Sequence, residues 1–152
     1  MASFRDPDGR DWTVDVNYVT LQRVDDVLGV KLLDEVQSNF AMLENPAVAC
    51  HALFLVCEDE AKERGVRDVD FAKMMKGDTY PRAIEALLRA IIAFFPSGRQ
   101  RVLLPTLEAS LNYERETEKM YHAVDGKELN RILNSTKNLS SEKCGESPES
   151  PE

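Results

Sequence analysis

An aspartate-rich segment near the N-terminus holds the first residues whose types and spacing could do chemistry. The run Asp6-Pro7-Asp8-Gly9-Arg10-Asp11 brings together carboxylates of the kind that bind calcium. An EF-hand loop has glycine at its sixth position and glutamate at its twelfth, whereas here Gly9 is fourth and Asn17 is twelfth. Proline, aspartate and glycine in this order are typical of a tight turn. We therefore expect a hairpin turn and no metal.

A second candidate is the group Cys50, His51 and Cys57, whose side chains are zinc ligands in many proteins. The two cysteines are seven residues apart, and no second pair follows at the short spacing of zinc sites. On one helix they would lie roughly 10 Å apart, too far for a disulfide. We interpret them as small core residues with reduced thiols, which indicates a cytosol-like compartment.

Nucleophilic catalysis needs a base beside the nucleophile and a group that orients the base. The chain has two histidines, His51 and His122, and neither lies in a Gly-x-Ser-x-Gly or comparable motif. Its seven glycines are scattered singly, so no glycine-rich phosphate loop is present. The sequence predicts no catalytic residues and no cofactor, so we expect a protein that is not an enzyme. An enzyme with an unrecognised site stays an alternative.

Composition limits the class of protein further. A chain of 152 residues is typical of one domain, and its net charge of −8 disfavours direct binding of nucleic acid. The sequence has no run of 18 apolar residues, so we expect no membrane span. The N-terminus has neither the basic nor the apolar region of a signal peptide.

A change of hydrophobic period near residue 18 defines the fold class. Trp12, Val14 and Val16 alternate with polar residues, as in a strand with one buried face, and later apolar residues recur at helical spacing. We predict a mainly α protein with a short N-terminal β-hairpin, at about 3–17, packed on a bundle of about five to six helices. A single α-rich domain would cover 1–133, and an acidic, disordered tail would cover 134–152.

Capping residues and helix breakers predict where the helices begin and end. Thr20 is expected to cap a short helix that Gly29 ends, and Asp34 or Ser38 to begin another one. The remaining expected helices run from Pro46 to about Arg64, from the cap Asp68 to Gly77, from about Thr79 to Phe95 at the centre of the bundle, and from Arg99 or Gln100 onward. In that last helix Pro105 marks a kink or the true start, and Leu104, Leu107, Leu111, Met120 and Tyr121 line its inner side.

Methionine and phenylalanine side chains are the candidates for contact with a partner. Phe40, Met42, Met74 and Met75 fall in or beside short predicted helices, where a groove would suit an amphipathic helix. Ordinary burial preferences favour the core for the same side chains, and the residues alone leave both interpretations open.

The N-terminal run from Phe4 to Val14 resembles the opening of small tail proteins of long-tailed phages and prophages, notably tail assembly chaperones. The order of later segments is also similar, with Asn45-Pro46 before a long helix, Val69-Asp70-Phe71, and an apolar helix that ends at Phe94-Phe95. The similarity covers about 4–96 and consists of a pattern of ordinary residue types, with no catalytic signature.

This resemblance implies a non-enzymatic protein that coats apolar helical segments of the tape measure protein in the host cytoplasm. Such chaperones also help recruit tail-tube subunits, and they leave before the particle matures. The alternative is a structural minor tail or connector subunit that stays in the particle and extends a neighbour's sheet through the hairpin edge. Self-association through exposed edges is compatible with either function.

Overall fold

The computed structural model describes residues 2–38, 40–123 and 130–135. Internal contacts divide the chain into two compact units, Met1–Pro105 and Thr106–Glu152. The predicted domain 1–133 stays a prediction, and the first compact unit ends earlier. Of the predicted tail, residues 134 and 135 are helical, and the rest lies outside the described residues.

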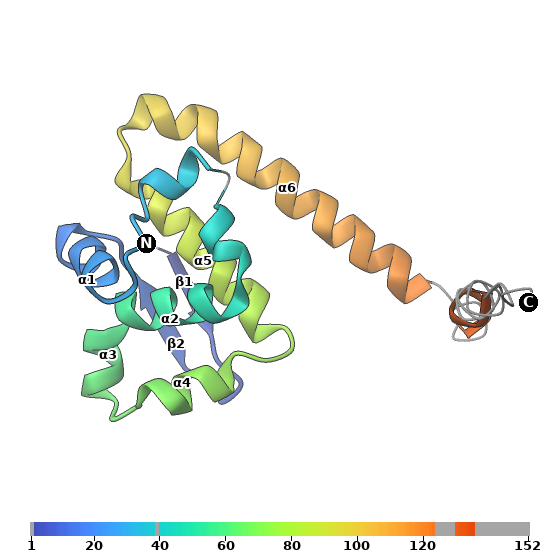
Figure 1. Ribbon diagram of the computed structural model, residues 1–152, viewed down its shortest axis with the longest axis horizontal. Coiled ribbons are helices and arrows are strands. Elements are labelled where there is room, and N and C mark those ends of the chain that lie inside the picture. The colour runs from blue at the N-terminus through green and yellow to red at the C-terminus, as the bar shows by residue number, and fades with distance from the viewer. Residues whose placement is uncertain (1, 39, 124–129, 136–152) are drawn as a thin grey trace, which may run out of the picture. The chain divides into compact units, whose positions relative to one another are not determined.

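The chain is mainly helical with a short antiparallel hairpin at its N-terminus, which confirms the predicted fold class (Figure 1). In chain order the elements are β1 (Ala2–Arg5), β2 (Asp11–Val14), α1 (Tyr18–Leu28), the 3₁₀ turns η1 (Asp34–Val36) and η2 (Ala41–Glu44), α2 (Pro46–Val56), α3 (Glu58–Glu63), α4 (Asp68–Met74), α5 (Thr79–Phe94) and α6 (Ser97–Ala123). Among the described residues, none of the helices combines the length and apolarity that crossing a membrane requires.

The hairpin follows the predicted alternation. Trp12, Val14 and Val16 are buried, whereas Thr13 and Asp15 between them are exposed. Phe4 of β1 lies opposite Trp12 of β2, and their rings stack with centroids 6.4 Å apart. One face of the hairpin is therefore part of the core.

The turn between β1 and β2 is organised by the buried carboxylate of Asp6. Its Oδ1 accepts hydrogen bonds from the backbone N–H groups of Asp8 (3.0 Å) and Arg10 (2.9 Å). Its Oδ2 accepts from Arg10 Nε (2.8 Å) and from the Trp12 indole Nε1 (2.9 Å). Gly9 completes the turn with φ of 84°, a conformation that a residue with a Cβ adopts at a cost. Both Asp6 oxygens are thus occupied by donors of the protein itself.

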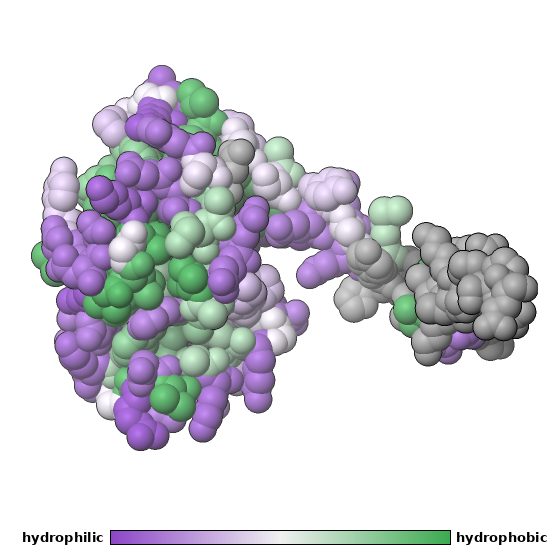
Figure 2. Space-filling view, viewed as in Figure 1, coloured by the Kyte–Doolittle hydropathy of each residue, from purple (hydrophilic) through white to green (hydrophobic). Residues whose placement is uncertain are grey.

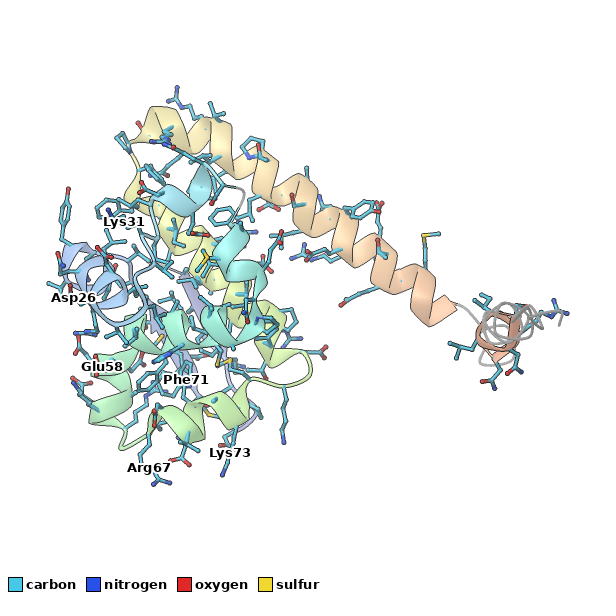
Figure 3. All side chains as sticks on the ribbon, in the orientation of Figure 1. Asp26, Lys31, Glu58, Arg67, Phe71 and Lys73 are labelled. Atoms are coloured by element: carbon cyan, nitrogen blue, oxygen red, sulfur yellow. The ribbon has the colours of Figure 1, made fainter. Side chains whose placement is uncertain are left out.

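Aromatic side chains join the hairpin to the helices. Phe71 of α4 meets Trp12 edge to face at 5.3 Å between centroids, and it meets Phe54 of α2 at 5.4 Å. Figure 3 shows Phe71 extending from α4 toward α2. Such pairs add to the stabilisation from apolar burial, so this cluster fixes α2, α4 and the hairpin against one another.

Helix α5 occupies the central position that its apolar sequence predicted. Its buried residues include Leu87 and Ile91, which are fully buried, and Ala83, Ala86 and Ala90. Helix α5 packs against β1 (Figure 1). A bulkier side chain at the buried alanines would overpack the core.

The predicted cap of α1 was wrong. Asn17, and not Thr20, is the N-cap, because its side-chain oxygen accepts from the N–H groups of Val19 and Thr20. The Thr20 hydroxyl accepts in turn from the Asn17 N–H at 2.9 Å, which completes a capping box. Gly29 ends the helix with φ of 66°, as predicted.

The single helix predicted from Pro46 to Arg64 is divided into α2 and α3 at Cys57. There the backbone has φ of −91° and ψ of 5°, outside the α-helical region. Glu58, Asp59 and Glu60 follow in the first turn of α3, where carboxylates interact favourably with the positive end of the helix dipole. This acidic triplet supports a new helix start. The expected start at Asn45 and Pro46 is confirmed.

Two further boundaries differ from the predicted ones. The helix expected from Asp34 or Ser38 is replaced by the 3₁₀ turns η1 and η2. Asp68 is the first residue of α4, whereas Arg67 holds the N-cap position without a side-chain cap. The Asp68 Oδ1 accepts from the adjacent Val69 N–H at 2.8 Å.

Helix α6 begins at Ser97 and continues through Pro105. Proline lacks a backbone N–H, which is why Pro105 was a candidate for the true start, but the helix begins earlier. Met120 is 71% exposed, so the prediction that it lines an inner side was wrong. The side chain of Tyr121 lies outside the described residues.

Candidate functional site

The candidate site is a surface groove of about 480 Å³ between the start of α2 and the α4–α5 connection. We call it the α2–α5 groove. It is lined by Pro46, Ala47, Cys50, Ala72, Met75, Lys76, Gly77 and Tyr80. Figure 2 shows that hydrophobic side chains reach the surface around α2, among hydrophilic ones.

Local sequence signals set the walls of this groove. Asn45 caps α2, with its Oδ1 accepting from Ala47 N–H at 3.0 Å, and Pro46 occupies the first turn. Gly77 has φ of 58°, and this left-handed residue allows the chain to turn sharply from α4 into α5. The two helix starts are therefore held beside the end of α4.

The groove is apolar with one cationic group. Burial raises the pKa of the Cys50 thiol above its ordinary value. Burial also raises the pKa of the Tyr80 phenol, and proximity to Cys50 adds to this shift. Both groups are neutral at pH 7, and Lys76 is the one lining residue with a charged side chain. Such a groove can bind an apolar side chain and present an ammonium group beside it.

Of the predicted contact residues, Met75 lines the α2–α5 groove. Met74 is directed elsewhere, because its sulfur lies 3.4 Å from the Arg10 Nη2 at the hairpin turn. Phe40 is partly buried against the core, and Met42 is 49% exposed in η2. The structure therefore places one of the four in this groove, and their joint role in binding stays a prediction.

Phe40 and Met42 are positioned by Glu35, which is 6% exposed. The Phe40 N–H donates to the Glu35 carbonyl at 2.6 Å, and the Met42 N–H donates to the Glu35 Oε2 at 3.0 Å. Phe40 has φ of 59°, a left-handed conformation that is strained for a bulky residue. The chain around η2 is thus held in place by a buried carboxylate.

The linings of two further hollows in the first unit, beside Lys31 and beside Phe54, carry charges of both signs. One, of about 230 Å³, includes Asp25, Lys31 and Asp34. The other, of about 430 Å³, lies beside Phe54 and includes Glu58, Lys62, Arg67 and Asp68. Mixed charges of this kind form pairs on the surface, as Lys62 and Glu58 do at 3.2 Å.

The outer edge of β2 is closed by side chains. The Thr13 N–H donates to Glu60 Oε2 at 2.9 Å, and the Thr13 carbonyl accepts from the Cys57 Sγ at 3.7 Å. The Asp11 carbonyl accepts from Arg64 Nη2 at 2.6 Å. Three of the four outward main-chain groups of Thr13 and Asp11, which another strand would need on this side, are therefore occupied.

The edge of β1 differs. The Asp6 N–H donates to the Arg10 carbonyl at 2.9 Å, and alternation along the ladder then directs the main chains of Phe4 and Ala2 toward β2. The N–H and carbonyl groups of Ser3 and Arg5 must point away from β2. Among the described residues they have no hydrogen-bond partner. On the β1 side the outward main-chain groups of Ser3 and Arg5 are thus without hydrogen bonds in the described structure, although α5 packs against this strand.

Cys50, Lys76 and Tyr80 are the groove residues that sequence reasoning missed. Cys50 was assigned to the core together with Cys57, but only Cys57 is fully buried, whereas Cys50 is partly exposed. The positions of Pro46 and Tyr80-Pro81 mark two helix starts in the sequence, and these starts are the sequence signal for the groove residues. What the sequence does not give is that these starts lie side by side.

Within the described part of the chain, no group of three or more His, Cys, Asp or Glu residues is arranged to hold a metal ion. His51, which was weighed as a ligand with the two cysteines, is exposed on α2. Comparison with family models, with curated proteins and with solved structures gives no match to this chain.

Proposed function

We propose that this chain is a non-enzymatic binding protein of the tail-assembly-chaperone type, which captures apolar helical segments of a tape measure protein. The observation that carries the proposal is the α2–α5 groove, whose lining is apolar apart from Lys76. Met75 offers a flexible thioether in that groove, and methionine adapts to partners of varied shape. A helical partner would place an apolar side chain against Met75, Cys50 and Tyr80.

The resemblance to these chaperones also supports the proposal, because it covers about 4–96 and so falls within the compact unit that holds the groove. On this proposal the protein acts in the host cytoplasm. Its net charge of −8 would help to keep a complex with an apolar chain in solution.

Co-expression tests this function. The partner is the longest helical protein encoded by the phage or prophage that encodes this chain, and the readout is its soluble fraction. We expect the wild-type chain to raise this fraction and Met75→Asp to lose most of the effect, because a carboxylate would be buried against the apolar partner.

Val69→Asp is the matched control for Met75→Asp. Val69 lies on α4, the helix that ends directly before Met75, is 51% exposed and does not line the groove, so this variant should act like the wild type. Equal activity of Met75→Asp and Val69→Asp would contradict capture at the α2–α5 groove.

A second candidate function is a structural minor tail or connector subunit, and the main-chain groups of β1 that have no hydrogen-bond partner among the described residues favour it. A strand from a neighbouring subunit would find the N–H and carbonyl groups of Ser3 and Arg5 available for pairing. Ser3→Pro removes one outward N–H without touching the ladder to β2, whereas Ser3→Thr keeps it. If the chain is a structural subunit, purified particles contain it, and Ser3→Pro alone lowers its amount. Particles without the chain would exclude this function.

A further inference from the structure

The charge of the α2–α5 groove distinguishes it from the two hollows beside Lys31 and Phe54. Those hollows are lined by both acidic and basic side chains, whereas Lys76 alone carries a charge in this groove. No ion pair joins Lys76 to any other described residue. An apolar groove in a protein with a net charge of −8 therefore has an unpaired cation at its rim.

The backbone adds to this positive potential. Pro46 and Ala47 belong to the first turn of α2, and Tyr80 belongs to the first turn of α5, so two helix N-termini border the groove. The N-terminus of a helix carries a partial positive charge. Asp78, which precedes α5, makes no side-chain cap to it and does not line the groove.

The other polar groups of the lining do not offset this charge. The Cys50 thiol and the Tyr80 phenol have raised pKa values, so neither is an anion at pH 7. The remaining lining residues are Pro46, Ala47, Ala72, Met75 and Gly77, which have no ionisable side chain. The groove thus combines an apolar floor with a cationic rim.

We propose that the α2–α5 groove selects amphipathic helices of a partner protein that carry a carboxylate beside their apolar anchor. The anchor contacts Met75, Cys50 and Tyr80, and the carboxylate pairs with the Lys76 ammonium. This inference rests on the proposed function and specifies its partner, because capture of apolar helices alone does not require an acidic residue.

Three synthetic helical peptides of ~18 residues test the selection, a length at which an isolated helix can form. They share one apolar face and differ only in the residues that flank it, which are Glu, Gln or Lys. Binding of each fluorescently labelled peptide to the full-length chain is measured by anisotropy. We expect the Glu peptide to bind most tightly and the Lys peptide most weakly.

Lys76→Glu should weaken binding of the Glu peptide about three- to five-fold and strengthen binding of the Lys peptide, as for a partly exposed ion pair. Lys62→Glu is the matched control, because it changes the net charge equally at another hollow. It should leave the order of the peptides unchanged. Thermal unfolding of both variants checks that each remains folded.

The outcomes separate the two proposals. If all three peptides bind equally and Met75→Asp weakens them all, the groove captures apolar helices but the charge selection is overturned. If Lys62→Glu and Lys76→Glu have the same effect, the preference reflects net charge and not the rim, which also overturns the selection. If no peptide binds, both proposals fail.

Discussion

The indole Nε1 of Trp12 donates a hydrogen bond of 2.9 Å to the buried carboxylate of Asp6, across the turn that joins β1 to β2. Trp12 is fully buried and touches Phe4 and Phe71, so this bond ties the turn to the core. The same carboxylate accepts from the N–H groups of Asp8 and Arg10. One side chain therefore links the local geometry of the hairpin to its packing on the helices.

Asp6→Asn should destabilise the fold by about 2–4 kcal/mol, because the amide nitrogen that replaces one oxygen cannot accept from Trp12 or Arg10. Chemical denaturation followed by tryptophan fluorescence measures this change. Asp8→Asn is the control, since Asp8 is exposed and its ion pair with Arg10 is 3.3 Å long. The control should change stability by at most about 0.5 kcal/mol. Equal effects of the two variants would contradict the role assigned to Asp6.

Asp6 also predicts how stability depends on pH. Burial alone would raise its pKa, but the hydrogen bonds from Trp12 and Arg10 outweigh burial and hold the pKa below the ordinary value of 3.8. The unfolded chain therefore binds the proton more readily. The stabilisation by Asp6 is complete above pH 3.8 and is lost as the pH falls through the lower, folded pKa.

The comparison of wild type with Asp6→Asn isolates this titration. Because Asn does not titrate, the difference in unfolding free energy should be constant near neutral pH and shrink below about pH 4. Denaturation at a series of pH values measures it. A difference that stays constant down to the acid end of the series would show that Asp6 has an ordinary pKa.

Several elements were predictable because their signals are local. The alternation around Trp12 and Val14 identifies a strand, and the pair Asn45-Pro46 identifies a helix start. Both depend on residues a few positions apart, and both are confirmed. The apolar sequence of α5 likewise placed it in the core, since apolar side chains on most of a helix surface must be covered.

The features that were missed depend on contacts between distant residues. Cys57 interrupts the long predicted helix where its thiol contacts Thr13 of β2, a contact that no local pattern reveals. Phe40 adopts its left-handed conformation in a segment that hydrogen-bonds to the buried Glu35. From its type alone, a glutamate is expected on the surface. The α2–α5 groove also needs α2 and α5 to lie side by side, and the sequence does not specify this arrangement.

At Phe40 we expect substitution by glycine to leave a more stable protein than substitution by alanine. At φ of 59° glycine fits better than alanine, so Phe40→Gly should be more stable than Phe40→Ala by about 1 kcal/mol. Both variants lose the same packing of the phenyl ring, so their difference reports the backbone. Ala93→Gly, on an exposed position of α5, should instead be destabilising by about 0.5–1 kcal/mol. If Phe40→Ala is the more stable variant, the left-handed conformation is wrong.

The cysteines should differ in reactivity. Burial raises the pKa of Cys57 to about 12, and the nearby Glu60 adds to this, so its thiolate is scarce at any ordinary pH. Burial raises the pKa of Cys50 as well, but its side chain is partly exposed. The third cysteine, Cys144, lies outside the described residues and is replaced by serine so that only two thiols react. In this Cys144→Ser background, iodoacetamide at pH 8 should modify Cys50 well before Cys57. Peptide mapping by mass spectrometry reads both sites, and faster modification of Cys57 would contradict the burial described for the two residues.

Cys50 lines the α2–α5 groove, so its reactivity reports whether the groove is covered. Alkylation of Cys50 therefore tests directly whether this groove captures a helical partner. The Cys144→Ser chain is co-purified with the proposed partner, a tape measure protein, and the rate of Cys50 alkylation is compared with that of the free chain. We expect at least about ten-fold protection of Cys50 in the complex, because a docked helix covers the thiol. A stable complex in which Cys50 reacts as fast as in the free chain would show that the partner binds elsewhere.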